Sequence, residues 1–211
     1  MSKLLNFVLI GVGSFGKKRA QSIKKSKNAT LVGLFDKDKA LLKSVSEELN
    51  VKAYDEEEIF KKDNEIDVVC ICAPNKYHID YIKKSIESNK HIFCEKPLVK
   101  NLQEAQELLE YSKGYKKKIQ IGSNHRFFES VIYAKKLVDE NIIGEILSFN
   151  GRIGHNGERL KDSWFWKKDI SGGGTLLDNG CHLLDLSRYF CGSFDNGIGS
   201  TSNSYWKNLE V

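Results

Sequence analysis

Proline, methionine and long apolar runs are scarce in this sequence. The chain has two prolines and one methionine among 211 residues. No apolar run approaches the roughly 20 residues that a membrane-spanning helix needs. The apolar stretch near the N-terminus is not followed by the small residues of a cleavage site, so we expect a buried strand there and not a secretion signal. These absences favour a cytoplasmic protein without a membrane partner.

The cysteines and arginines argue against two further classes of protein. The five cysteines are an odd number and lack paired metal-ligand spacing, which favours reduced thiols over a disulfide framework or a metal site. The net charge of +5 comes from 28 lysines and only five arginines. Nucleic-acid recognition usually recruits arginine in a localised stripe. We therefore interpret the lysines as a solvated surface and predict no nucleic-acid partner.

Strand-like and helix-like segments alternate through the first half of the chain. Amphipathic segments with apolar residues at helical spacing separate short, β-branched segments that are nearly continuous in apolar character. The expected strands are Asn6–Gly13, Ala29–Asp36, Asp67–Pro74, His91–Lys96 and Lys117–Asn124, and the expected helices include Lys39–Leu49, His78–Asn89 and Leu102–Ser112. The alternation predicts an α/β domain with a doubly wound parallel sheet over residues 1–123.

The pattern changes after Arg126. A helical stretch at Ser130–Asn141 is followed by an alternating strand at 144–154, an aromatic loop, and a glycine-led helix at 171–190. No proline-rich or low-complexity linker separates the halves, so the boundary near Ser123 rests on this change alone. The last residues, 197–211, have the pattern of a strand and turn without a closing element. We therefore expect a second, incomplete domain over residues 124–211.

A glycine motif follows the first expected strand and precedes a helix expected over Phe15–Ser26. Its spacing is that of the G-x-G-x-x-G fingerprint. The glycines permit a tight turn, close approach to a pyrophosphate and close helix packing, while the helix N-terminus attracts the phosphates. An incidental glycine turn is the alternative, but the strand before the motif and the helix after it favour a dinucleotide site. The predicted cofactor-binding residues here are Gly11, Gly13, Ser14, Phe15 and Gly16.

Asp36 ends the second expected strand, twenty residues beyond Gly16. A carboxylate there can accept hydrogen bonds from an adenosine ribose, and it would repel a ribose phosphate. We therefore predict NAD as the cofactor, with NADP possible because the adjacent Lys37 partly offsets the charge. The alternative role of Asp36 is to cap the following helix, and the two roles can coexist.

Lys96 comes at the end of the fourth expected strand, directly before Pro97. Pro74 and Pro97 both end expected parallel strands, on the edge where open α/β sheets bind their ligands. Lys96 is either a solvated surface residue or a cation aimed at a cofactor crevice. In the second case its ammonium can donate a hydrogen bond to a substrate hydroxyl and assist proton transfer.

Asp178 and His182 stand four residues apart, so on a helix they share one face. Such a pair is more often a surface contact or a core histidine than a catalytic pair. Here it follows a run of three glycines, which allows a ligand to approach closely, and it lies in a leucine-rich segment that should be buried. Imidazole is the usual general base near neutral pH, and a carboxylate can orient it.

Five stretches, in this order, resemble the Gfo/Idh/MocA family of NAD(P)-dependent oxidoreductases. They are GVGSFG at 11–16, CAPNKYH at 72–78, CEKPL at 94–98, GSNHRF at 122–127 and GGGTLLDNGCHLLDL at 172–186. The resemblance covers nearly the whole chain. It implies a Rossmann domain followed by a substrate-binding and catalytic α/β domain with an open sheet. It also implies an NAD-dependent dehydrogenase that oxidises a hydroxyl of a sugar, cyclitol or nucleotide sugar.

The resemblance also implies roles for particular residues. Lys96 matches the lysine that hydrogen-bonds the reacting hydroxyl, His182 the general base, and Asp178 the carboxylate that positions substrate and proton. The bond between Lys96 and Pro97 is often cis in the family. The residues expected to line the cofactor are Pro74, Asn75, His78, Glu95 and Lys96. The expected substrate-binding residues are Asn124, Arg126 and Trp166, although the first two could instead join the domains and Trp166 could serve packing alone.

Length is where the sequence departs from the family, whose members usually continue for more than half as much again. We therefore expect a C-terminally shortened chain with an exposed apolar sheet edge and doubtful activity of its own. A full-length form is expected to be a homo-oligomer. Two alternatives to a dehydrogenase stay open: an NAD-dependent glycoside hydrolase of the same family, and a catalytically inactive cofactor-binding regulator.

Overall fold

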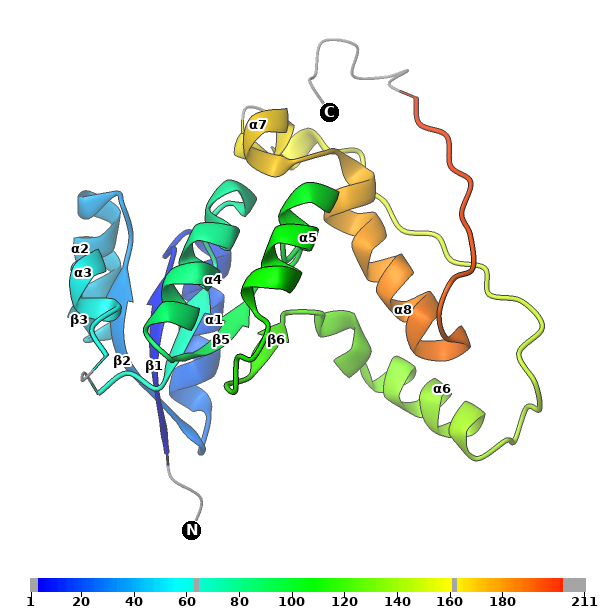
Figure 1. Ribbon diagram of the computed structural model, residues 1–211, viewed down its shortest axis with the longest axis horizontal. Helices are drawn as coiled ribbons and strands as arrows, with labels where there is room; N and C mark the ends of the chain where they lie inside the picture. The colour runs from blue at the N-terminus through cyan, green and yellow to red at the C-terminus, as the bar shows by residue number, and fades with distance from the viewer. Residues whose placement is uncertain (1–3, 63–64, 161–162, 203–211) are drawn as a thin grey trace. The chain divides into compact units, whose positions relative to one another are not determined.

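The chain forms two compact units, Met1–Gly122 and Ser123–Val211, in the computed structural model (Figure 1). The structure describes residues 4–62, 65–160 and 163–202. Among these residues, no helix combines the length and apolar character needed to cross a membrane. Each unit is described by itself below.

The first unit is built on a six-stranded sheet whose strands all run parallel, in the order β3-β2-β1-β4-β5-β6 (Figure 1). The order reverses at β1, which pairs with β2 on one side and β4 on the other; this is the doubly wound, Rossmann-type arrangement. The predicted fold class is thereby confirmed for this unit. The strands are Leu5–Ile10 (β1), Ala29–Phe35 (β2), Lys52–Ala53 (β3), Val68–Ile71 (β4), His91–Cys94 (β5) and Ile119–Ile121 (β6). The two-residue β3 was not predicted because it is too short to show a periodic pattern.

Several helices of the first unit begin at polar caps, whereas the first helix and the helix His78–Glu87 have no side-chain cap. The Asp38 carboxylate accepts a hydrogen bond from the Leu41 amide at 3.0 Å, and the Asn101 side chain accepts one from the Glu104 amide at 2.8 Å. The first helix starts at Gly13 and has no side-chain cap. The helices are Ser14–Lys25 (α1), Lys39–Leu49 (α2), Glu56–Ile59 (α3), His78–Glu87 (α4) and Leu102–Tyr111 (α5).

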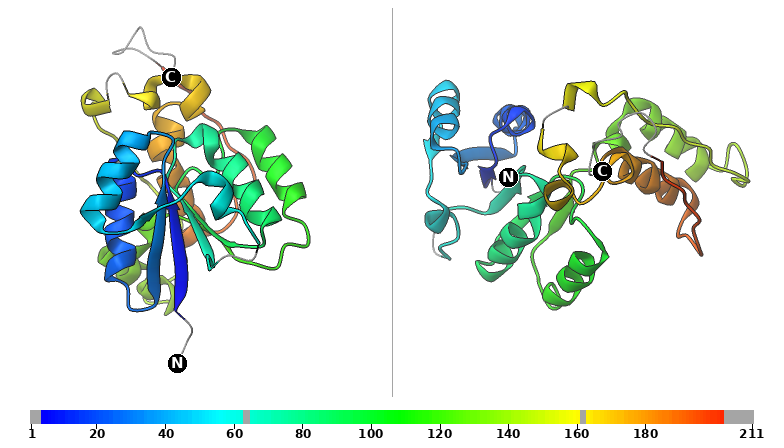
Figure 2. Two further views of the ribbon diagram at one scale, coloured as in Figure 1. Left: turned by 90° about the vertical axis from the view of Figure 1, so that its left-hand side faces the viewer. Right: turned by 90° about the horizontal axis from the view of Figure 1, so that it is seen from above.

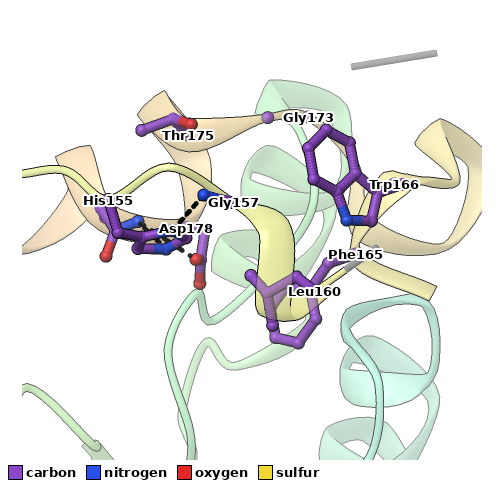
Figure 3. A pocket seen from close by; sticks show the side chains of 10 residues that line it. His155, Gly157, Leu160, Phe165, Trp166, Gly173, Thr175 and Asp178 are labelled. Carbon is purple, nitrogen blue, oxygen red and sulfur yellow. Dashed lines mark hydrogen bonds between the residues drawn. The ribbon is translucent and has the colours of Figure 1, made fainter. Parts of the chain in front are cut away.

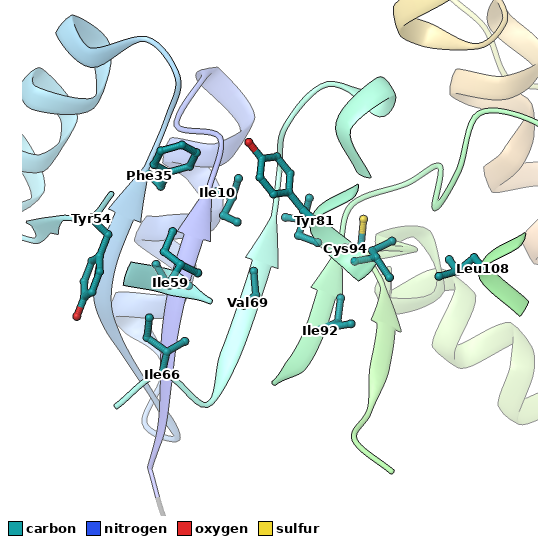
Figure 4. Close-up of a cluster of buried hydrophobic side chains, with 13 residues drawn as sticks. Ile10, Phe35, Tyr54, Ile59, Ile66, Val69, Tyr81, Ile92, Cys94 and Leu108 are labelled. Atoms are coloured by element: carbon teal, nitrogen blue, oxygen red, sulfur yellow. The ribbon is translucent and has the colours of Figure 1, made fainter. Parts of the chain in front are cut away.

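The helices bury both faces of the sheet, as the left view of Figure 2 shows. On one face, α3, α4 and α5 contribute Ile59, Ile82 and Leu108 to a cluster with alternate residues of β1 and β4 (Figure 4). On the other face, α1 and α2 contribute Ala20 and Leu42 to a second cluster. Because both faces are covered, the central strands are apolar at nearly every position, which is the pattern that identified them in the sequence.

The regular secondary structure of the second unit is helical in its described residues. It contains a 3₁₀ turn at Asn124–Phe127 (η2), then Glu129–Asp139 (α6), short turns at Glu158–Leu160 (η3) and Trp164–Trp166 (η4), and Lys168–Ser171 (α7). A π-helical turn at Leu176–Gly180 (η5) leads directly into Cys181–Cys191 (α8). The glycine-led helix expected at 171–190 is therefore interrupted, because α7 ends at Gly172 with φ at 86° before the π turn begins.

The alternating strand expected at 144–154 is not formed. A strand needs a hydrogen-bonded neighbour, and within residues 123–160 and 163–202 no strand is present to pair with it. The segment is drawn as coil in Figure 1, and apolar side chains such as Leu147, which is 92% exposed, are not covered. The expected exposed sheet edge is thus replaced by exposed apolar coil. Residues 203–211 of the expected final strand lie outside the described residues.

Replacing Ile82 by alanine should destabilise the first unit. Ile82 lies on α4 and is completely buried against the sheet, so the substitution loses apolar burial and leaves a cavity, at a cost of about 2–5 kcal/mol. Urea unfolding followed by circular dichroism measures the change. Leu109→Ala is the matched control, since Leu109 on α5 is 72% exposed and its loss should change stability by less than about 0.5 kcal/mol. Equal effects of the two substitutions would contradict the placement of the core.

Candidate active site

Two of the three motif glycines are required by the protein's own packing. Gly11 has φ at 90°, and a Cβ there would lie 2.6 Å from the Ala73 amide nitrogen in the loop after β4. A Cβ on Gly16 would lie 1.9 Å from the Gly11 carbonyl oxygen. Only glycine therefore allows the turn after β1 to pack between α1 and the β4 loop.

Gly13 differs from both of its neighbours in the motif. Its φ of −60° and ψ of −174° are open to any residue. Among the described residues, no atom beyond its own chain neighbours lies within 4 Å of the position that its Cβ would occupy. It is exposed at the start of α1, where no side chain caps the helix. The first turn of α1 therefore presents backbone amides to an open space, which fits the pyrophosphate of a dinucleotide.

Asp36, directly after β2, holds the glycine turn in place. Its Oδ2 accepts a hydrogen bond from the Val12 amide at 2.8 Å, and its Oδ1 accepts one from the Asp38 amide at 3.0 Å. The alternative role considered from the sequence, a cap for the following helix, belongs to Asp38 instead. The Asp36 carboxylate is half-buried beside the glycine turn. Its negative charge would therefore act on a ribose bound next to this turn.

His78 joins the loops that follow β4 and β5. Its Nδ1 lies 2.8 Å from the Pro97 carbonyl oxygen and its Nε2 lies 2.8 Å from the Ala73 carbonyl oxygen. The side chain is 1% exposed, and burial lowers the pKa of the imidazole. The sequence predicted that His78 lines the cofactor. Both ring nitrogens lie within hydrogen-bonding distance of carbonyl oxygens of the two loops, while the contact of His78 with the cofactor stays a prediction. The neighbouring Asn75 is also buried, and Pro74 begins its turn.

Glu95 and Lys96 follow β5 at the same edge of the sheet. Glu95 is buried and forms an ion pair with Arg19 of α1, whose Nε donates to Oε1 at 2.9 Å and whose Nη2 lies closer still. Burial raises the pKa of the Glu95 carboxyl, and the Arg19 charge opposes that shift. Its carboxylate also occupies the space where Gly122 has no side chain, since a Cβ there would lie 2.6 Å from Oε2. Lys96 is half-buried, and its bond to Pro97 is cis.

The second unit contains a small cavity of about 60 Å³ that is open to solvent (Figure 3). The π turn η5 contributes Asp178 and Asn179 to its wall, and η4 contributes Phe165 and Trp166. His155 completes the polar part of the lining: its Nδ1 accepts a hydrogen bond from the Gly157 amide at 2.9 Å, and its Nε2 lies 3.2 Å from the Asn179 amide nitrogen. An aromatic wall opposite several polar groups suits a hydroxylated ligand.

His182 lies on α8, four residues after Asp178, and is 6% exposed. Its ring stacks on that of His125 from η2, with centroids 3.8 Å apart and planes inclined by 14°. Asp178 lies in the π turn and not in the regular α-helix that the i, i+4 spacing predicted. Single π turns within helices are often found at functional sites.

Arg126 and Asn124 both belong to η2. The Arg126 guanidinium is bound by both carboxylate oxygens of Asp185 on α8, with Nε to Oδ2 at 2.7 Å, and it lies over the Tyr189 ring at 4.8 Å. Arg126 therefore links η2 to α8 within the second unit. Its expected contact with substrate stays a prediction. Asn124 is exposed.

The structure groups the predicted residues by unit. The glycine turn, Asp36, Glu95 and Lys96 lie in the first unit, whereas Asp178, His182 and Trp166 lie in the second. Three residues with clear roles in these groups were missed in the sequence: Arg19, His125 and His155. His125 stands inside the GSNHRF stretch and could have been noticed there. Arg19 and His155 belong to a lysine-rich helix and an irregular segment, and neither pattern reveals their partners.

Two family models match the chain. Residues 5–123 match the oxidoreductase family with an NAD-binding Rossmann fold, and residues 131–210 match the GFO/IDH/MocA C-terminal domain. The first match alone covers more than half of the sequence. Its extent agrees with the first compact unit, which contains the sheet and the glycine turn.

Several individual relatives are also similar. Levoglucosan dehydrogenase of Pseudarthrobacter phenanthrenivorans is 35% identical over 144 residues, which are 66% of this chain and 37% of that protein. A 2,7-anhydro-N-acetylneuraminate hydratase of Escherichia coli is 28% identical over 196 residues, which are 92% of this chain and 52% of that protein. A solved levoglucosan dehydrogenase in complex with NADH and levoglucosan has a TM-score of 0.84 at 28% identity, over 91% of this chain and 55% of that one.

The chain therefore spans about half of the length of these relatives, or less. The matches run through both units and cover the residues of the glycine turn and the stretch around Asp178 and His182. On this evidence the chain belongs to the Gfo/Idh/MocA family of oxidoreductases with an NAD-binding Rossmann fold.

Proposed function

We propose that this chain binds NAD at the carboxyl edge of the sheet in its first unit. The observation that carries the proposal is the open space at Gly13. Among the described residues, neither the backbone angles nor a neighbouring atom requires glycine at this position, and glycine here leaves room for a ligand that approaches the backbone closely. The uncapped first turn of α1 supplies amides for the pyrophosphate. Asp36 would accept hydrogen bonds from the adenosine ribose.

We also propose that the protein transfers a hydride between NAD and a hydroxyl-bearing carbon of a sugar, cyclitol or nucleotide sugar. Bound NAD supplies the hydride acceptor. In the oxidation direction, His182 removes the proton of the substrate hydroxyl while the C–H bond of the carbon that carries this hydroxyl is broken. Asp178 orients the imidazole and the substrate. Lys96 donates a hydrogen bond to the same oxygen and stabilises the negative charge that develops on it.

The support for this reaction is the family membership together with the cavity of the second unit. His155, Asn179 and Asp178 provide hydrogen-bonding groups there, and Trp166 and Phe165 provide an apolar wall. Sugars present hydroxyls and C–H faces together, so they match such a lining. The related levoglucosan dehydrogenase is described with a sugar derivative and NADH.

We further propose that the protein works in the cytoplasm without nucleic acid, and that a longer form would be a homo-oligomer. The cysteines support a reducing compartment: all five are free thiols, and burial raises the pKa of the Cys94 thiol well above its usual value, which keeps it unreactive. Exposed apolar residues of the second unit, such as Leu147, support association.

Replacing Gly13 by valine should weaken NADH binding without unfolding the protein. The new side chain would fill the open space and obstruct the pyrophosphate, so we expect the Kd for NADH to rise by about tenfold or more. Fluorescence titration measures the Kd, and thermal unfolding checks the fold. Gly154→Val is the matched control, because a Cβ at Gly154 also meets nothing within 4 Å but the residue lies outside the first unit. Wild-type affinity in Gly13→Val would refute the placement of the pyrophosphate.

Replacing Asp36 by asparagine should reduce the preference for NAD over NADP. The amide oxygen can still accept the hydrogen bond from Val12, while the negative charge that repels a ribose phosphate is lost. We expect the ratio of the two dissociation constants to change by about tenfold. Asp38→Asn is the control, because it removes a neighbouring charge and keeps a good helix cap. An unchanged ratio in Asp36→Asn would show that the carboxylate does not face the ribose.

Lys96→Met and His182→Gln should each lower the rate of NAD reduction by about 10²–10⁴-fold, because each removes a group that acts on the reacting hydroxyl. Absorbance of reduced nicotinamide measures the rate with a panel of sugars, cyclitols and nucleotide sugars. Lys100→Met is the control: this lysine pairs with Glu104 and lies four residues farther along the chain than Lys96.

Release of a sugar without accumulation of NADH would indicate the hydrolase instead. NADH binding with no reaction on any substrate would indicate the inactive regulator.

A further inference from the structure

Two histidine rings lie face to face in the second unit. His182 of α8 is 6% exposed, and the ring of His125 lies 3.8 Å from it and nearly parallel. His125 is half-buried and has Phe128 as a second ring neighbour, at 4.8 Å. His125 was not among the predicted site residues, and it has no role in the proposed reaction.

The geometry of the stack excludes a proton relay between the two rings. The N–H groups and lone pairs of imidazole lie in the plane of the ring. Because the two planes are inclined by only 14°, each ring presents its face to the other, and no nitrogen of one points at a nitrogen of the other. What remains between the rings is contact through their faces and the interaction of their charges.

The charges make the two protonation events depend on each other. Two imidazolium ions whose centres are 3.8 Å apart repel strongly, so protonation of one ring disfavours protonation of the other. His125 is the more exposed of the two, and solvent stabilises its charged form. His182 is almost fully buried, which disfavours its charged form. As pH falls, His125 should therefore take up a proton first.

Other charged groups near His182 act in both directions. Asp178 lies in the π turn that leads into α8 and Asp185 lies on α8, and a carboxylate near the ring favours its protonated form. Asp185 is neutralised by Arg126 of η2, while Lys135 of α6 lies over Tyr189, two turns farther along α8. His155, beside Asn179, is the remaining titratable group of the cavity. Asp178 thus favours protonation of His182, and within the described part of this unit the stacked His125 most directly opposes it.

We propose that His125 is a positioning residue for the general base: it holds the His182 ring by stacking and, once protonated, keeps His182 neutral. A neutral ring is the form that can accept the hydroxyl proton. The pair therefore extends the working range of the base toward lower pH. The role in catalysis rests on the proposed function, whereas the coupled titration of the two rings does not.

The test compares the titration of His182 in the wild type and in His125→Phe by NMR of the imidazole signals. Phenylalanine keeps an aromatic face against His182 but cannot carry charge. We expect the pKa of His182 to rise by about one unit. His125→Asn should raise it as well, and circular dichroism identifies any variant that does not fold. Lys135→Met is the control: this lysine is paired with Asp139 and lies over Tyr189 and not over the stacked rings, so its loss should leave the titration unchanged.

The pH dependence of kcat/KM provides the second measurement. In His125→Phe the acid limb should move to higher pH by the same amount, while the rate well above the pKa of His182 stays near that of the wild type. An unchanged His182 titration in both His125 variants overturns the inference. A shifted titration in a protein that never reduces NAD leaves the coupling intact and refutes the proposed dehydrogenase, so the two failures are distinguishable.

Discussion

The double pairing of β1 is the constraint on which the rest of the first unit depends. This strand is bonded to β2 along one side and to β4 along the other, both in parallel. The connections that follow must leave the sheet in opposite directions to cover its two faces. The turn after β1 therefore opens toward the Ala73 loop after β4, and the glycines let the two backbones meet closely. Asp36, Glu95 and Lys96 reach this edge because every strand ends there.

The residues at this edge are held by contacts that cross between elements. Asp36 secures the glycine turn from β2, and His78 joins the loops after β4 and β5 through two carbonyl oxygens. Arg19 neutralises the buried Glu95 beside Lys96. Removing one partner of a buried ion pair leaves an uncompensated charge, which is strongly destabilising. These contacts fix the backbone at this edge of the sheet, which reduces the entropy that would be lost on binding the proposed dinucleotide.

The sequence was sufficient for five of the six strands because burial on both faces leaves continuous apolar strands, and helix Lys39–Leu49 was predicted with its observed bounds. It was sufficient for the glycine turn because spacing and context agree there. It failed where a structure depends on a partner distant in sequence. The segment 144–154 alternates like a strand but has no neighbouring strand in the part of the chain that the structure describes. The Arg19–Glu95 pair spans 76 residues, and no local pattern predicts such a contact.

Gly122 is the last residue of the first unit, and the missing side chain there gives the Glu95 carboxylate its place. The Gly122 amide also donates a hydrogen bond to the Cys94 carbonyl oxygen at 2.8 Å. Gly122, where the chain leaves the first unit, therefore contacts Cys94 and Glu95, the two residues that precede Lys96. A larger residue at 122 would displace the carboxylate and change the direction of exit together, so this position cannot vary freely even though it contacts no proposed ligand. The residue at position 122 therefore affects both the path of the chain as it leaves the first unit and the surroundings of Lys96.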